Sequence, residues 1–364
     1  MISWFKKMQA AIVALAMVAV LAGCGSATKE AEPAAAKKEF NIGWSIYAGW
    51  MPWPYAQQAG IVKKYEDKYG IKINIVQVND YVESVNQYTA GKLDGVTVAS
   101  MDALTIPAAG GKDTTALIIG DYSNGNDGLV SKTAKNVASL KGQSINLVEL
   151  SVSHYLLARA LESANMKLSD VKTVNTGDAD IVAAFAAADV KNVVTWNPQL
   201  GEASKLAGAA PIFDSSDIPG EILDLLVVDT ELLKSNPNLG KALVGIWYET
   251  MALMSAQTPE GAKARAAMGI LAGTDAAGYD AQLKTTAMYY TAANAVKAAL
   301  DPALVTGMDR VRKFSFANGL FGPSATSVDA IGISFAGDKV LGRKDNIKLR
   351  FDPTWMQMAA DGKF

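Results

Sequence analysis

The chain has 364 residues, 50% hydrophobic and 19% charged, which is ordinary for a globular protein and leaves room for two domains. Its 34 Lys and Arg residues nearly balance 36 Asp and Glu residues, giving a formal net charge of −2. Without the signal peptide that we predict for residues 1–23, which contains Lys6 and Lys7, the chain has 32 basic and 36 acidic residues. This lack of basic excess argues against a nucleic-acid partner.

The first 23 residues have the pattern of a secretory signal peptide. Lys6 and Lys7 precede an apolar run from Ala10 to Leu21, which is too short to span a bilayer of ~30 Å as a mature helix. The run ends in Leu21-Ala22-Gly23-Cys24, which resembles a bacterial lipobox, in which the Cys becomes the lipidated first residue. The alternative is an ordinary signal peptide followed by a chance Cys.

Cys24 is the only Cys of the chain, so no disulfide and no thiolate metal site is expected. Residues 24–39 are rich in Ala, Glu and Lys and predict a flexible, lipid-anchored tether. We therefore expect a protein of the cell envelope, outside the cytoplasm and held to the membrane by Cys24.

The first part of the folded body alternates strands and helices. A buried strand at 40–46 leads into a loop that carries Tyr47, Trp50 and Trp53. Because a loop rarely carries so much aromatic surface, we interpret it as one wall of a ligand cleft. The remaining expected elements are a helix at 57–69, a strand at 71–78, a helix at 81–90, a strand at 96–99, a helix at 100–109 and a strand at 115–120.

Turn-forming residues at 121–128 indicate a crossing into a second domain, and the run 223–228 could return the chain to the first. Between them, strands are expected at 144–148, 171–174, 192–196 and 211–213, and helices at 153–164, 181–188 and 199–206. Helices follow at 237–255, 259–271 and 279–300. We predict an α/β fold with two lobes, residues 40–125 plus 229–364 and residues 126–228, which share one cleft at their strand ends.

The sequence offers little for catalysis. It has one His, His154, and neither a Gly-x-Ser-x-Gly elbow nor a Gly-x-x-x-x-Gly-Lys-[Ser/Thr] phosphate loop. A single His also excludes a multi-histidine zinc cluster. We predict that the protein is not an enzyme and that it carries no cofactor or metal.

Binding chemistry is better represented. The candidate site residues are the aromatic Trp44, Tyr47, Trp50, Trp53 and Trp196, with Asp102, Asp121 and Glu149 as acceptors. Aromatic faces and carboxylates attract a cation, and the first Arg of the chain is Arg159. Each residue also has a structural alternative: Asp102 could cap a helix, Trp44 and Trp53 could be core, and Glu149 could pair with a lysine. The helix start at 151–153 could instead bind an anion.

The order of several segments resembles the periplasmic solute-binding proteins of ABC transporters, in the nitrate/taurine/sulfonate-type group. These segments are Gly91-Lys92-Leu93-Asp94-Gly95, Leu140-Lys141-Gly142-Gln143, Ser153-His154-Tyr155-Leu156-Leu157, Val194-Thr195-Trp196-Asn197-Pro198 and Pro219-Gly220-Glu221-Ile222-Leu223-Asp224-Leu225. The run from Trp44 to Pro54 looks like the branch associated with urea carboxylase and guanidine-degrading operons. The resemblance implies a two-lobed type II periplasmic-binding-protein fold and a monomer that delivers solute to a permease driven by a separate ATPase.

We therefore expect a lipid-anchored receptor for a small nitrogen-rich solute, guanidinium first and urea or an amide next. One alternative keeps the fold but binds an anion such as taurine, an alkanesulfonate or nitrate. A more distant alternative is an enzyme on the same bilobal fold, of the pyrimidine-precursor synthase type.

Overall fold

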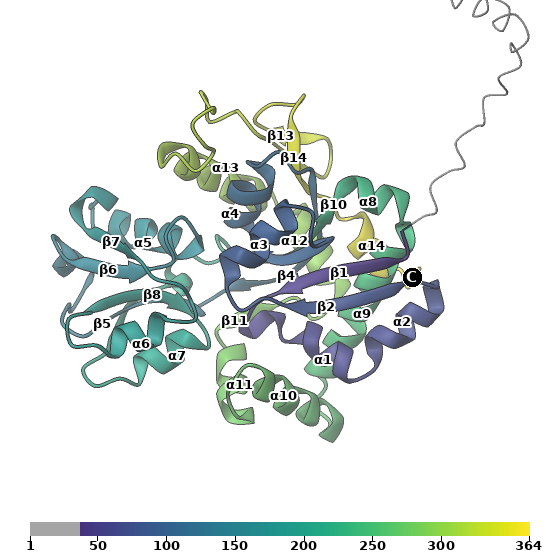
Figure 1. Cartoon of the computed structure of the whole chain (residues 1–364), viewed down its shortest axis with the longest axis horizontal. Helices are drawn as coiled ribbons and strands as arrows, with labels where there is room; N and C mark the ends of the chain where they lie inside the picture. The colour runs from purple at the N-terminus through teal and green to yellow at the C-terminus, as the bar shows by residue number, and fades with distance from the viewer. Residues whose placement is uncertain (1–36) are drawn as a thin grey trace, which may run out of the picture. The chain divides into compact units, whose positions relative to one another are not determined.

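The computed structural model describes residues 37–364, and the structural statements below concern this part of the chain (Figure 1). The expected signal peptide, the lipidation of Cys24 and nearly all of the tether lie outside the described residues. No helix of the described part has the length and hydropathy needed to cross a bilayer.

A large mixed sheet forms the core of the first lobe. Its strands follow the order β13-β12-β14-β4-β10-β3-β1-β2, and β11 pairs with β4. β1 lies parallel between β2 and β3, whereas β10 runs antiparallel between β3 and β4. The bounds are β1 (Glu39–Trp44), β2 (Lys72–Gln77), β3 (Gly95–Ala99), β4 (Thr114–Ser123), β10 (Leu223–Asp229), β11 (Thr286–Met288), β12 (Gly332–Phe335), β13 (Lys339–Leu341) and β14 (Ile347–Phe351).

The second lobe is built on a smaller mixed sheet with the order β7-β6-β8-β5-β9. Here β6 is parallel to β7 and β8, while β5 is antiparallel to β8 and β9. The bounds are β5 (Asp127–Ser131), β6 (Ser144–Leu147), β7 (Lys172–Asn175), β8 (Asn192–Trp196) and β9 (Ala210–Asp214). Both β3 and β8 are buried along their whole length, as their apolar, β-branched sequences require.

Helices flank both sheets (Figure 1). The smaller lobe has α5 (Val152–Ser163), α6 (Ile181–Ala186) and α7 (Gln199–Ser204). The larger lobe has α1 (Pro52–Gln58), α2 (Ile61–Tyr69), α3 (Tyr81–Thr89), α4 (Ser100–Ala103), α8 (Thr230–Ser235), α9 (Pro237–Ser255), α10 (Pro259–Leu271), α11 (Ala276–Leu283), α12 (Ala292–Leu300), α13 (Pro302–Ala317) and α14 (Thr354–Ala360). Local sequence fixes several starts: Asp80 caps α3 by accepting the Glu83 N–H at 2.7 Å.

The segment after β1 is more regular than expected. We predicted one loop with its helix starting at Gln57, but a 3-10 turn at Ala48–Trp50 is followed by α1, which begins at Pro52. Proline suits a first helical turn, where the missing N–H would have no intrahelical partner. The predicted helix at 57–69 is divided at Gly60, whose φ of 75° is left-handed and breaks the helix between α1 and α2.

The chain passes between the sheets twice, between β4 and β5 and between β9 and β10. β10 pairs with β3 and β4, so residues 223–228 belong to the larger sheet, although our division had assigned 126–228 to the smaller lobe. The second passage therefore lies at 215–222. The crossing residue Asn126 accepts the backbone N–H of Asn197 at 3.1 Å, which ties the first passage to the end of β8.

Candidate functional site

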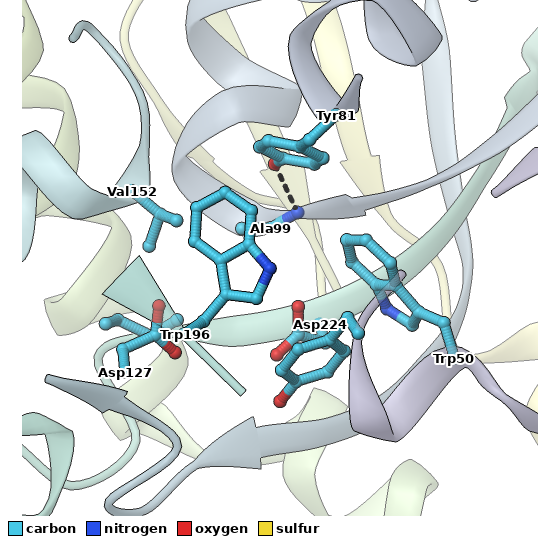
Figure 2. Close-up of a pocket in the computed structure, with 9 residues that line it drawn as sticks. Trp50, Tyr81, Ala99, Asp127, Val152, Trp196 and Asp224 are labelled. Carbon is cyan, nitrogen blue, oxygen red and sulfur yellow. Dashed lines mark hydrogen bonds between the residues drawn. The ribbon is translucent and has the colours of Figure 1, made fainter. Parts of the chain in front are cut away.

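A small cavity of about 20 Å³ lies where strand ends of the two lobes meet (Figure 2). The larger lobe contributes Tyr47, Trp50, Tyr81, Ala99 and Asp224, and the crossing contributes Ile222. The smaller lobe contributes Asp127, Val152 and Trp196.

Aromatic side chains form much of the wall. Trp50 contacts Tyr47 edge to face with ring centroids 4.9 Å apart, and Tyr81 lies 5.8 Å from Trp50 and 5.5 Å from Trp196. The Trp196 Nε1–H donates to the Ile46 carbonyl at 3.3 Å, which joins β8 to the end of β1. The Trp50 Nε1–H is buried and has no acceptor among the described residues, so a donor is available beside the cavity.

Two aspartates meet directly beside the cavity. Asp121 of β4 and Asp224 of β10 are partners in the antiparallel ladder, and both are buried. The Tyr47 hydroxyl donates to Asp121 Oδ1 at 2.9 Å, while Oδ2 of each aspartate has no donor among the described residues. Burial raises the pKa of Asp121 to about 7, and burial together with the Asp121 carboxylate raises the pKa of Asp224 well above its ordinary value.

A third acid faces the same space from the smaller lobe. Asp127 opens β5, and burial raises the pKa of its carboxyl to about 6. None of the nine lining residues is Lys or Arg. The site therefore gathers carboxyl groups without an opposing side-chain cation in its wall, an arrangement that disfavours their charged forms. Among the described residues, no group of three or more His, Cys, Asp or Glu is placed to hold a metal ion.

The expected site residues fall into two sets. Tyr47, Trp50 and Trp196 line the cavity, and Asp121 contacts Tyr47 just behind it. Asp102 is buried at the lobe boundary, where its Oδ2 accepts the Tyr81 hydroxyl at 2.5 Å and the Val152 N–H at 3.2 Å.

The other expected residues do not line this cavity. Trp53 packs on Trp247 of α9 with ring centroids 5.2 Å apart, inside the larger lobe. Trp44 is a buried residue of β1 that is likewise absent from the lining. Glu149 is half-buried and accepts a hydrogen bond from Thr173 of β7 rather than from a lysine.

Sequence reasoning missed Tyr81, Asp127 and Asp224. Asp224 had a visible signal, because a carboxylate in the apolar run Leu223–Val228 must be buried and therefore needs a partner or a function. Asp127 lies near the end of the turn-rich stretch 121–128 that predicts a crossing. Tyr81 follows the cap Asp80 as the first residue of a helix, and its role depends on packing that the sequence does not show.

The fold has counterparts among solved structures. The alkanesulfonate-binding protein of Xanthomonas axonopodis pv. citri, bound to MOPS, matches with a TM-score of 0.64 and 17% identity, covering 80% of this chain and 96% of that one. The nitrate-binding protein of Synechocystis PCC 6803 matches with a TM-score of 0.55 and 12% identity, covering 90% and 99%. The chain has the α/β periplasmic-binding-protein type II fold, with two mixed sheets flanked by helices, which confirms the expected fold class.

The family follows from the sequence. The model of the family described as NMT1/THI5 like matches residues 56–262, and the chain belongs to that family. A putative aliphatic sulfonates-binding protein of Escherichia coli (strain K12) is 34% identical over 84 residues. That match spans 23% of this chain and only 26% of the relative's length. The expected group is thus confirmed at the level of the family, and the urea- and guanidine-associated branch stays a prediction.

Proposed function

We propose that this protein is the extracytoplasmic solute-binding component of an ABC importer. Relatives named as binding proteins support this function rather than an enzyme of the same fold. The cavity between strand ends of both lobes suits capture by closure, in which the lobes rotate about the two crossings and bury the solute. The permease, the separate ATPase and a lipid anchor at Cys24 are parts of the same proposal.

We infer that the solute is a small nitrogen-rich compound, the guanidinium cation in the first place and neutral urea or a related amide next. The observation that carries this inference is the set of buried carboxyls at the cavity, Asp127 and Asp224 with Asp121 behind them, in a wall without Lys or Arg. A planar cation would donate charge-assisted hydrogen bonds to these oxygens and lie against Trp50 and Trp196. An anion in the same place would add charge to a site already crowded with acids.

The second candidate is an anion such as taurine, an alkanesulfonate or nitrate. The names of the relatives favour this class, since they speak of sulfonates, alkanesulfonate and nitrate. An anion could bind the backbone N–H groups at the start of α5 in place of the Asp102 carboxyl group, which accepts the Val152 N–H at 3.2 Å. The comparisons thus favour the anion, and the charges of the cavity favour the cation.

Calorimetric titration of the purified protein with guanidinium, urea, taurine and nitrate distinguishes the two. We expect heat with guanidinium, a weaker response with urea and none with the two others. Tight binding of taurine or nitrate without a guanidinium signal would overturn the cation and leave the receptor function intact. Turnover of any of these compounds during incubation would instead favour the enzyme.

The anchor has its own experiment. Cells that express the natural chain or Cys24→Ala are grown with a labelled lipid precursor, and the protein is isolated. We expect label on the natural chain only. Equal label on both chains would refute lipidation at Cys24 without affecting the proposed solute.

A further inference from the structure

Asp102 lies at the boundary between the lobes without lining the cavity. It belongs to α4, which begins directly after β3, and its side chain is fully buried. The Tyr81 hydroxyl that donates to Asp102 Oδ2 is itself fixed, because it accepts the Ala99 N–H at 3.1 Å (Figure 2). The larger lobe therefore holds this carboxylate in a defined orientation.

The carboxylate meets the start of a helix in the other lobe. Val152 is the first residue of α5, and its N–H donates to Asp102 Oδ2 at 3.2 Å. The next amide is satisfied locally, since Ser151 Oγ accepts the Ser153 N–H at 3.2 Å. α5 has 12 residues, and the start of such a helix carries partial positive charge and exposed N–H groups that bind anions. In this protein the anion at that position is a side chain of the opposite lobe.

Two further polar atoms at this position have unused hydrogen-bonding capacity. Asp102 Oδ1 and the Ser153 hydroxyl are buried, and neither has a hydrogen-bond partner among the described residues. The donors to the Asp102 carboxylate in this part of the chain are Tyr81 and Val152. A helix start and a phenol, rather than a basic side chain, thus hold the carboxyl group in place.

We propose that the Asp102 carboxyl group occupies the start of α5 in the place of an external anion, so that it excludes anionic solutes from the site and links the two lobes. This inference rests on the proposed solute-binding function, whose selectivity it explains. Asp102 is a positioning residue: it acts on the smaller lobe through Val152 and does not contact the solute. Removing its carboxylate should weaken capture of a cation and leave a vacancy that a small external anion can fill.

The test is chemical rescue of Asp102→Ala. Guanidinium affinity is measured by calorimetry in chloride buffer, with and without formate at equal ionic strength. We expect Asp102→Ala to bind guanidinium about tenfold more weakly than the natural protein, the middle of the usual range for coupling between sites. Formate should restore severalfold of that loss. The matched control is Asp275→Ala, which removes a carboxylate that caps α11 within one lobe and should show neither the loss nor the rescue.

A second variant removes the donor instead of the acceptor. Val152→Pro deletes the N–H that Asp102 accepts, at a first helical position where proline is well tolerated. We expect Val152→Pro to weaken guanidinium binding. In the double variant, the loss of binding free energy should be smaller than the sum of the two single losses, because the two residues are in contact. This variant keeps the test available if Asp102→Ala does not fold.

Several results would overturn the inference. These are no effect of formate on Asp102→Ala, additive losses in the double variant, or nitrate binding to the natural protein as tight as to Asp102→Ala. The proposed function fails separately, if the natural protein gives no heat with guanidinium. In that case the nitrate titrations still test the inference. Nitrate binding to Asp102→Ala but not to the natural protein would support it, and equal binding to both would overturn it.

Discussion

At the scale of single residues, the pairing of Asp121 with Asp224 sets the charge of the cavity. Two carboxyls that face each other in a buried ladder cannot both ionise at little cost, so they hold a proton in the absence of a cation. A bound cation removes that constraint because it supplies the missing opposite charge. The Tyr47 hydroxyl keeps Asp121 oriented and leaves the Asp224 oxygens to face the cavity.

Asp224→Asn should therefore weaken guanidinium binding by about ten- to a hundredfold, since a hydrogen bond to a charged group contributes roughly 1.5–3 kcal/mol. Calorimetry measures the change. Asp189→Asn, which neutralises an exposed carboxylate of the smaller lobe, should leave the affinity unchanged. Equal affinity of Asp224→Asn and the natural protein would remove Asp224 from the site.

Trp53 gives a contrasting prediction, because it packs on Trp247 instead of lining the cavity. Trp53→Ala should lower the free energy of unfolding by about 3–5 kcal/mol, the usual cost of deleting a buried large aromatic side chain. Denaturant unfolding measures the loss. The guanidinium affinity of the folded fraction should stay near that of the natural protein, whereas Trp50→Ala should reduce it; a large affinity loss in Trp53→Ala would argue for a place in the site.

At the scale of elements, the second crossing is held by a charge cluster. Glu221 accepts the Tyr155 hydroxyl at 2.6 Å and Arg159 Nε at 2.8 Å, both from α5, and it also pairs with Arg310 of α13. Burial acts to raise the pKa of Glu221, but the hydrogen bonds from Arg159 and Tyr155 outweigh it and hold that pKa below its usual value. The crossing, the smaller lobe and the larger lobe thus meet at one carboxylate.

Glu221→Gln should destabilise the protein by about 1.5–3 kcal/mol, because it weakens hydrogen bonds to charged partners that remain in place. Since the pKa of Glu221 is lowered, its contribution is present at neutral pH and disappears in acid as the carboxylate is protonated. Denaturant unfolding at neutral pH measures the loss. Glu162→Gln, which removes an exposed partner of the same Arg159, is the matched control and should cost under about 1 kcal/mol; equal losses would contradict the role of the cluster.

For the molecule as a whole, the buried acids set the dependence of stability on pH. Burial raises the pKa of Asp102 and Asp121 to about 7 and of Asp127 to about 6, and the pKa of Asp224 is raised as well. Between their ordinary value of 3.8 and these values, the folded chain binds more protons than the unfolded chain. His154 acts in the opposite sense, because burial lowers its pKa. Carboxylates whose pKa is lowered, such as Glu221 and Asp113, also act in the opposite sense, but mainly near and below their ordinary values of 4.5 and 3.8, at the acid end of this range.

The free energy of unfolding of the solute-free protein should therefore decrease as pH rises from about 4 to about 7. Denaturant unfolding across this range measures it. Guanidinium affinity should rise over the same window, because the cation binds the ionised carboxyls and displaces their protons. Asp224→Asn should flatten both trends, and a stability that increases from about pH 4 to about pH 7 would contradict the assignment of the four acids.

Much of the fold could be predicted from local pattern. The buried strands β3 and β8 are short apolar runs bounded by helices, and Asp80 and Ser151 mark helix starts by their capping chemistry. Boundaries were less predictable where several local signals competed. Proline can start a helix or interrupt one, so the prolines after β1 do not decide whether Trp53 belongs to a loop or to α1. The packing against α9 decides it.

Of the site, the sequence by itself determined the aromatic segment around Tyr47 and Trp50, the role of Trp196 at a strand end and the scarcity of arginine. These follow from residue type and from the rule that strand ends share one edge of a sheet. The tertiary structure decided which carboxyls share the cavity. Asp224 reaches Asp121 only through the antiparallel insertion of β10, and Asp102 reaches α5 only where the lobes meet. Contacts between residues 50 to 103 positions apart depend on strand order and lobe placement, which no local pattern encodes.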